Sequence, residues 1–299
     1  MVNKPPITVA EQINLLKSRG MLFKDEAQAA QLLKNVSYYR LKGYWWDVQD
    51  KTTHIFNSNT YFEDIANRYS FDRELRLILF DAIEYIEIAL RTKMIYHLSI
   101  SYGSLWYLNE DLMTDNAIHQ RLLEDLNKEF DRSQEIFIKD HKYRYPNDKA
   151  DVWKMLEVAS MGTLSKLYKN LQHQLPEKAI IAKEMGLNLH RELSSWLEAI
   201  SYIRNIIAHH SRLWSRSMVK IPMEQLNNPM GAWFAQRLMP AQLKKPFLII
   251  STMVYLCGFI DANNTIKNRL LDLLSKNAHL PIYKLGFFNN WEEQPIWNA

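Results

Sequence analysis

Apolar residues recur every three or four positions along most of this chain, a spacing that is typical of helices packed on one face. The longest run extends from Arg73 to about Ser99. Ser70 to Asp72 precede it, and because Ser and Asp side chains compete for backbone donors, we expect a break or bend there. Shorter runs predict further helices at 10–19, 24–35, 61–69, 116–131, 152–159, 164–171, 177–185, within 190–216, and at 244–275 with an interruption near 261–264.

The remaining segments predict little regular structure. Residues 132–151 are polar and basic, and we expect them to form an exposed loop. The prolines of 217–239 predict an irregular segment with one short helix around Trp233. Residues 56–59 are typical of a turn that could join a small hairpin. The chain from 278 onward, with prolines and a glycine, should be mostly irregular.

Composition agrees with an all-α fold. The 299 residues include only 8 Gly and 10 Pro, too few for the many tight turns of an all-β protein. We find no repeat and no clear linker. The prediction is therefore a helical bundle at 61–275, preceded by an N-terminal helical extension at 1–60 and followed by a mostly irregular tail at 276–299.

Charge, cysteine content and hydropathy narrow the environment. The net charge of +4 is compatible with an RNA partner without requiring one. Cys257 is the single cysteine, so no intrachain disulfide can form and a reducing compartment is expected. The longest apolar stretch, from Phe247 to Ile260, is shorter than the roughly 20 residues of a membrane span. No signal peptide is evident, and we expect a cytoplasmic protein without a membrane partner.

The segment 190–216 concentrates polar side chains on one side of an apolar helix pattern. Asn205 and His209 are four residues apart and should lie one above the other, with Arg204 just before them. Arg212 and the second imidazole of His210 follow. An imidazole near pKa 6.5 can accept or donate a proton, and a guanidinium can stabilise a phosphorane-like charge. These side chains can therefore act on a phosphodiester without a metal.

Two alternatives remain open for this segment. The polar residues can simply form the solvated face of an amphipathic helix. In addition, Arg204 and His209 point about 140° apart on an ideal helix, so one helix alone does not bring both to one phosphate. A two-fold dimer, in which each copy contributes its Arg and His, would meet that requirement.

Other candidate residues lie further toward the N-terminus. Glu87 and Arg91 are spaced for an ion pair within a helix, which either is an exposed surface pair or orients the catalytic side chains. Among the aromatic and basic residues of 38–46, Arg40, Tyr44 and Trp45 are candidates for binding RNA by charge and stacking. The alternative for this stretch is an apolar cluster that attaches the extension to the bundle.

Other chemistries have no motif in the sequence. It contains no cysteine pair, no His-Glu-x-x-His and no aspartate-rich loop, so no metal site is predicted. Glycine-rich nucleotide loops are missing as well, and we expect no cofactor.

Several blocks, taken in order, resemble the Abi family of bacterial abortive-infection proteins, in particular its AbiD/AbiF-like group, whose members carry a HEPN-type domain. The blocks are EQINLLKSRG at 11–20, SYYRLKGY at 37–44, YFEDIANRYSFDRELR at 61–76, IEYIEIALRTKMIYHLS at 83–99 and RNIIAHHSRLWSR at 204–216. The HEPN pattern of Arg, four to six residues and His falls on Arg204 and His209, with Asn205 as its polar neighbour.

The resemblance implies a HEPN-like fold and an antiphage toxin that cleaves RNA without a metal, usually as a homodimer, and that is sometimes restrained by an RNA antitoxin. Arg204, His209 and Asn205 would form the catalytic centre, with Glu87, Arg91, His210 and Arg212 in support. The competing hypotheses are a module that binds RNA without cleaving it and a helical scaffold with no affinity for RNA. The sequence does not decide whether His209 or His210 acts.

Overall fold

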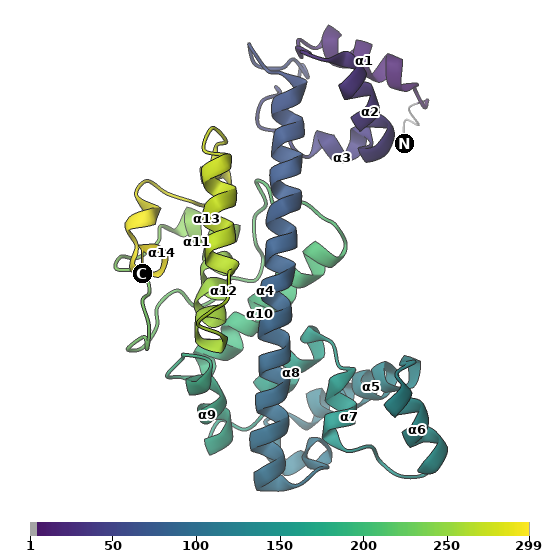
Figure 1. The fold of residues 1–299 in the computed structure, drawn as a ribbon, viewed down its shortest axis with the longest axis vertical. Coiled ribbons are helices and arrows are strands. Elements are labelled where there is room, and N and C mark those ends of the chain that lie inside the picture. Colours follow the sequence, from purple (N-terminus) through teal and green to yellow (C-terminus); the bar gives the residue numbers. More distant parts are fainter. Residues whose placement is uncertain (1–4, 299) are drawn as a thin grey trace.

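The computed structural model describes residues 5–298, which form α-helices and short 3₁₀-helices with no strand (Figure 1). The predicted all-α fold is confirmed. The helices are α1 Val9–Ser18, α2 Glu26–Val36, α3 Tyr38–Lys42, α4 Phe62–Tyr102, α5 Asn116–Arg132, α6 Ile136–Arg144, α7 Val152–Glu157, α8 Met161–Asn170, α9 Pro176–Glu184, α10 His190–Ala208, α11 Pro240–Leu243, α12 Pro246–Ile260, α13 Ile266–Lys276 and α14 Pro295–Asn298.

Helix α4 is the axis of the molecule. Its 41 residues run from the N-terminal helices to the opposite end (Figure 1). The predicted break at Ser70 to Asp72 is wrong, because the Asp72 side chain is buried and bonds to groups of other segments rather than to the backbone of its own turn. A side chain bound elsewhere no longer competes for the donors of the helix.

The other helices cover α4 along its length. Helices α12 and α13 pack along one side, α10 crosses α4 near its middle, and α7, α8 and α9 pack toward its C-terminal half (Figure 1). The interruption expected near 261–264 separates α12 from α13. Helix α12 is apolar and buried on nearly all sides. Within the described residues, no helix is both long and apolar enough to cross a membrane.

Helices α1 to α3 lie at the N-terminal end of α4 (Figure 1). Backbone hydrogen bonds between Leu22 and the Thr60–Phe62 segment attach them to the start of α4. In place of the expected hairpin around 56–59, only an isolated antiparallel bridge joins Gln49 to Phe56. Trp45 packs edge to face on Phe56, so apolar contacts complete the attachment.

Three segments depart from the sequence prediction. Residues 136–144, expected as an exposed loop, form α6, because Ile138 and His141 are buried against the preceding elements. No helix forms around Trp233. Its ring is buried instead against Trp196. The chain after Lys276, expected to be mostly irregular, contains the short helices Ile282–Leu285, Trp291–Glu293 and α14, and Trp297 stacks on Phe247 of α12.

Candidate basic cleft at the end of α10

Helix α10 ends in a reversed turn that places two histidines in different environments. His209 is the C-cap, and His210 has φ 53°, a left-handed conformation that glycine usually occupies. The His210 amide donates to the Ile207 carbonyl at 2.8 Å, and the Ser211 amide donates to the Ile206 carbonyl at 2.9 Å. This Schellman pattern satisfies the last carbonyls of the helix and turns the chain toward α3 and α4.

Two neighbouring clefts open beside this turn. The first, here called the arginine cleft, has a volume of about 600 Å³ and is lined by Arg40, Tyr69, Arg73, Arg76, Leu77, Phe80, Arg204, Ile207, Ala208 and His210. The second, here called the aromatic cleft, has a volume of about 750 Å³ and is lined by Ser37, Tyr39, Arg40, Lys42, Gly43, Tyr44, Trp46, His210, Ser211, Arg212 and Arg216.

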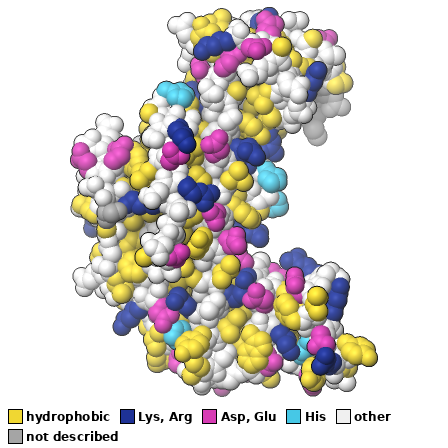
Figure 2. Space-filling model, viewed as in Figure 1, with side chains coloured by type: hydrophobic (Ala, Val, Ile, Leu, Met, Phe, Trp, Pro, Cys, Tyr) yellow, Lys and Arg dark blue, Asp and Glu magenta, His cyan; other side chains and the backbone are white. Residues whose placement is uncertain are grey.

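Both clefts carry positive charge. Neither lining includes an Asp or a Glu, whereas each includes several Arg or Lys side chains. Arg40 and His210 line both clefts and therefore stand at the boundary that the clefts share. Figure 2 shows Lys, Arg and His side chains on the hollowed side of the molecule, between the N-terminal helices and α5–α7. A concave surface with one sign of charge attracts phosphates.

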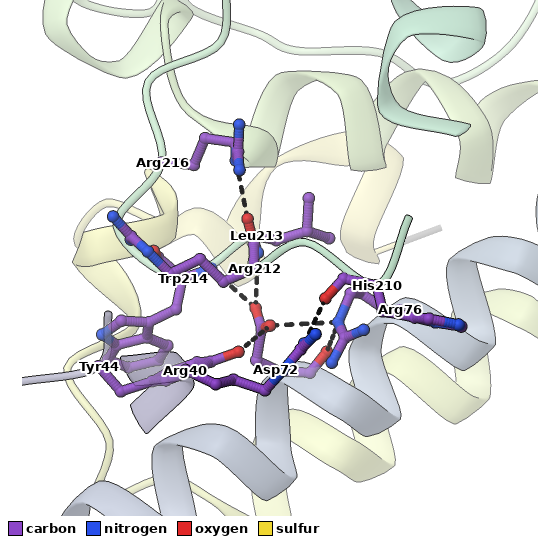
Figure 3. A network of polar contacts seen from close by, with 9 residues as sticks. All are labelled: Arg40, Tyr44, Asp72, Arg76, His210, Arg212, Leu213, Trp214 and Arg216. Atoms are coloured by element: carbon purple, nitrogen blue, oxygen red, sulfur yellow. Dashed lines mark hydrogen bonds and ion pairs between the residues drawn. The ribbon is translucent and has the colours of Figure 1, made fainter. Parts of the chain in front are cut away.

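The buried carboxylate of Asp72 connects the three segments that form the clefts (Figure 3). Its Oδ2 accepts hydrogen bonds from the Tyr44 hydroxyl at 2.8 Å and from Arg76 Nε at 3.2 Å. Its Oδ1 accepts the backbone amides of Leu213 at 3.0 Å and Trp214 at 2.7 Å. One side chain of α4 thus fixes both the segment after α3 and the segment after α10.

Burial and hydrogen bonding act in opposite directions on the Asp72 carboxyl, and its pKa is raised overall. Burial raises the pKa of the Asp72 carboxyl, while the Tyr44 hydroxyl, Arg76 and the two amides act in the opposite direction. Three of its four partners, Arg76 Nε and the backbone amides of Leu213 and Trp214, can only donate, whereas the Tyr44 hydroxyl can also accept. Burial and the nearby Arg216 lower the pKa of Arg212, which reflects the crowding of cations above this carboxylate.

Two contacts join α3 to the end of α10. Arg40 Nη1 donates to the His210 carbonyl at 2.7 Å, which holds the left-handed turn from outside. Gly43 allows the second contact, since a Cβ there would lie 2.9 Å from Cδ of Arg212. The Arg212 guanidinium in turn donates to the Trp214 carbonyl. The basic side chains are therefore placed by hydrogen bonds and close packing, not only by their position along the chain.

The residues predicted as the catalytic centre do not all meet in one chain. Arg204 is half-buried and lines the arginine cleft together with His210. Asn205 and His209 are exposed and line neither cleft. The structure therefore pairs Arg204 with the second imidazole of the motif, and leaves the first one facing outward at the end of α10.

Glu87 and Arg91 form an ion pair that is largely shielded from solvent. Arg91 Nη2 donates to Glu87 Oε1 at 2.8 Å and to the Ala159 carbonyl at 3.1 Å. The Arg91 side chain is 12% exposed and the Glu87 side chain is 20% exposed, so the pair is not the exposed surface pair that was one of the two alternatives. Burial raises the pKa of Glu87, which Arg91 and Arg204 oppose. Arg204 is thus close enough to act electrostatically on this carboxylate.

The predicted RNA-binding aromatics require a correction. Tyr44 and Trp45 are 1% and 0% exposed, and buried rings have no face to offer a base. The same segment exposes Tyr39 and Trp46 instead, at 84% and 53%, and both line the aromatic cleft. Arg40 is exposed and lines both clefts. The order of aromatic and basic residues along 38–46 does not tell which rings turn inward.

Asp72, Arg73 and Arg76 were not among the predicted site residues. Arg73 and Arg76 are three residues apart on α4, with Leu77 and Phe80 continuing the same face toward Arg204. The only sequence signal was a pair of arginines interrupting an apolar helix pattern. For Asp72 itself, the sequence pattern predicts a break in the helix. Among residues 5–298, no three His, Cys, Asp or Glu side chains are grouped so that they could hold a metal ion.

Comparison with known proteins identifies a family for this chain. The sequence model of the family described as Abi-like protein matches residues 31–215, which include α3, α4, α10 and the segment bound by Asp72. No curated protein and no solved structure matches the chain significantly. The family match covers more than half of the 299 residues. The chain therefore belongs to the family of Abi-like proteins, which points to abortive-infection defence.

Proposed function

We propose that this chain is a metal-independent endoribonuclease of bacterial antiphage defence, acting on RNA in the cytoplasm. The observation that carries the proposal is that Arg204 and His210 open onto one cleft whose lining has several arginines and no carboxylate. Such a lining suits a phosphodiester backbone, and it combines a proton-transfer group with charge stabilisation.

The proposed reaction is an internal transfer at phosphorus. An imidazole of the His209–His210 pair accepts the proton of a ribose 2′-OH as its oxygen attacks the adjacent phosphorus. The bond from phosphorus to the 5′-oxygen breaks, and that oxygen leaves as a hydroxyl after receiving a proton from an imidazolium. The products are a 2′,3′-cyclic phosphate and a 5′-OH end. Arg204, with Arg73 beside it in the cleft, stabilises the charge that develops on the phosphoryl oxygens.

A homodimer is part of the proposal because His209 faces outward from the single chain. Leu77 and Phe80, which line the arginine cleft, are 54% and 46% exposed, and Ile88 follows on the same helix at 49%. Large apolar side chains at the edge of a cleft are typical of a protein interface. A second copy seated on them would bring its own His209 toward the cleft of the first.

The test uses three single variants of the full chain, Arg204→Ala, His209→Ala and His210→Ala, incubated with total RNA in the presence of EDTA. The wild type should leave 2′,3′-cyclic phosphate ends, and Arg204→Ala together with at least one histidine variant should lose cleavage by 100-fold or more, on the order of what a general acid or base contributes. His279→Ala, an exposed histidine far along the chain, is the matched control. Full cleavage by all three variants would refute the assignment.

A second function is a module that binds RNA without cleaving it. It is favoured by the position of His209, which lies outside both clefts in the single chain. The RNA would then be a regulatory or antitoxin RNA. This function predicts salt-dependent RNA affinity with intact RNA after prolonged incubation, whereas a helical scaffold predicts no affinity at moderate salt.

A further inference from the structure

The aromatic cleft holds groups that the proposed chemistry does not use. Tyr39 and Trp46 expose most or half of their surface there, although aromatic rings of this size are usually buried. Lys42 Nζ lies 5.3 Å from the Trp46 ring centre, which holds a positive charge against the indole. Arg40, Arg212 and Arg216 complete the basic lining.

The chemistry of this lining matches an unpaired nucleotide strand. Exposed rings beside cations can stack bases while the cations hold the phosphates, and every base offers a face for stacking. In a duplex the base faces are covered by neighbouring pairs, so the rings would have nothing to contact. The volume of about 750 Å³ lies within the range of roughly 300–1,000 Å³ that is usual for ligand sites.

The aromatic cleft adjoins the arginine cleft at two shared lining residues. Arg40 and His210 line both clefts, so a strand whose scissile phosphate lies beside Arg204 continues past them into the aromatic cleft. The hydrogen bond of 2.7 Å from Arg40 Nη1 to the His210 carbonyl fixes α3 relative to the end of α10 at this boundary. Paired nucleotides on that flank would lose the stacking contacts.

We propose that the aromatic cleft is a binding subsite for unpaired RNA flanking the cut, in which Tyr39 and Trp46 stack bases and Arg40, Lys42 and Arg216 hold phosphates. This inference rests on the proposed function for the nature of the ligand, but it concerns binding and not cleavage. It selects RNA with a single-stranded segment next to the scissile position.

The experiment measures affinity by fluorescence anisotropy with a 12-nucleotide 2′-fluoro RNA, which lacks the attacking hydroxyl, as a single strand and as a blunt duplex. The wild type should prefer the single strand. Tyr39→Ala and Trp46→Ala should each weaken single-strand binding about 5-fold to 150-fold, which is the range measured for losing one stacked base. Tyr39→Phe and Trp46→Phe keep a ring and should stay within about threefold of the wild type.

Tyr143→Ala on α6, at 87% exposure and outside both clefts, is the matched control and should bind like the wild type. Thermal unfolding confirms that each variant is folded. The inference is overturned if Tyr39→Ala and Trp46→Ala both bind as the wild type does, or if the duplex binds as tightly as the single strand. Because the probe cannot be cleaved, this outcome is independent of the cleavage results that test the proposed function.

Discussion

Asp72 is a buried carboxylate that joins the segments from which the two clefts are formed. Its carboxylate is 0% exposed and accepts four hydrogen bonds, two of them from backbone amides 141 and 142 residues away. Removing one partner of such a buried pair leaves charge or donors unsatisfied, which costs more than the pair contributes. Arg76 and the segment after α10 both depend on it.

Asp72→Asn should therefore lower the free energy of unfolding by about 2–4 kcal/mol. The asparagine NH2 group would face either Arg76 Nε or the two backbone amides, which can only donate, and Arg76 loses its counter-charge. Urea unfolding followed by circular dichroism measures the change. Glu74→Gln, two residues along α4 and exposed, is the control and should stay within about 0.5 kcal/mol. A comparable small change for Asp72→Asn would contradict the assigned role.

Lys178 gives a prediction about pH. Its ammonium group is buried and donates to the carbonyls of Lys169 and Leu171 at the end of α8, and burial lowers its pKa to about 8. Between pH 8 and the ordinary value of 10.5, the unfolded chain binds this proton more tightly than the folded chain. Stability linked to Lys178 is thus present above pH 10.5 and is lost as pH falls through 8.

The free energy of unfolding of the wild type, relative to Lys178→Met, should accordingly rise between pH 8 and pH 10. Chemical unfolding at several pH values gives this difference directly. Lys183→Met replaces an exposed lysine of the same helix and should keep the pH dependence of the wild type. A difference between wild type and Lys178→Met that stays constant with pH would show that the environment of Lys178 is described incorrectly.

At the scale of elements, the end of α10 determines where the site residues point. A helix continued through His210 would place the two imidazoles on adjacent sides of α10, but the Schellman turn ends it at Ala208. The left-handed conformation at His210 is unfavourable for a residue with a Cβ, by roughly 1 kcal/mol. The Arg40 contact to its carbonyl helps to hold it.

His210→Gly should raise the free energy of unfolding by about 0.5–1 kcal/mol, because glycine adopts positive φ without steric cost. His209→Gly is the matched control. His209 has φ −86°, so glycine gives no relief there and a small loss of stability is expected. Urea unfolding of the two variants is compared with the wild type. A less stable His210→Gly would mean that its side chain makes stabilising contacts that outweigh the strain.

At the scale of the whole molecule, α4 has a buried face that packs against other helices and an exposed face with large apolar side chains. Its buried face is packed by α8, α10, α12 and α13, while its exposed face carries Leu77 and Phe80 at the arginine cleft and Ile88 further along the helix. Arg204 faces that cleft and His209 does not. If a second copy covers the exposed face, the working pair is formed between chains.

Mixing two inactive variants tests this arrangement. If Arg204→Ala and His209→Ala each abolish cleavage as homodimers, the mixture should regain about a quarter of the wild-type activity, because half of the dimers are mixed and each retains one intact pair. The measurement is cleavage of a labelled RNA after co-refolding or prolonged exchange. No recovery in a mixture that is shown to exchange subunits would place the whole site within one chain.

Phe80→Glu tests the interface itself. A charge on the exposed apolar face should shift the wild-type dimer toward monomer in analytical ultracentrifugation and reduce cleavage with it. Tyr283→Glu, which replaces a more exposed aromatic residue outside α4 and outside the arginine cleft, should leave the association unchanged. A wild type that is monomeric at micromolar concentration would exclude this interface.

The sequence by itself determined the local structure and the identity of the motif. Periodic apolar positions give helices wherever a stripe can be buried, so the helical class, α5, α10 and the α12–α13 pair follow from spacing alone. A prediction from local sequence was wrong where a contact with a distant segment changed the local preference. Asp72 does not break α4, and 136–144 is helical, because both segments gain their bonds or burial from other parts of the chain.

Only the tertiary structure decided which side chains share the cleft. Tyr44 and Trp45 turn inward while Tyr39 and Trp46 remain exposed, and Arg204 meets His210 and Arg73 rather than His209. The second outcome depends on contacts across more than a hundred residues, such as that from Asp72 to Leu213 and Trp214. Local spacing fixes the direction of a side chain relative to its own helix, but only packing fixes the direction of one helix relative to another.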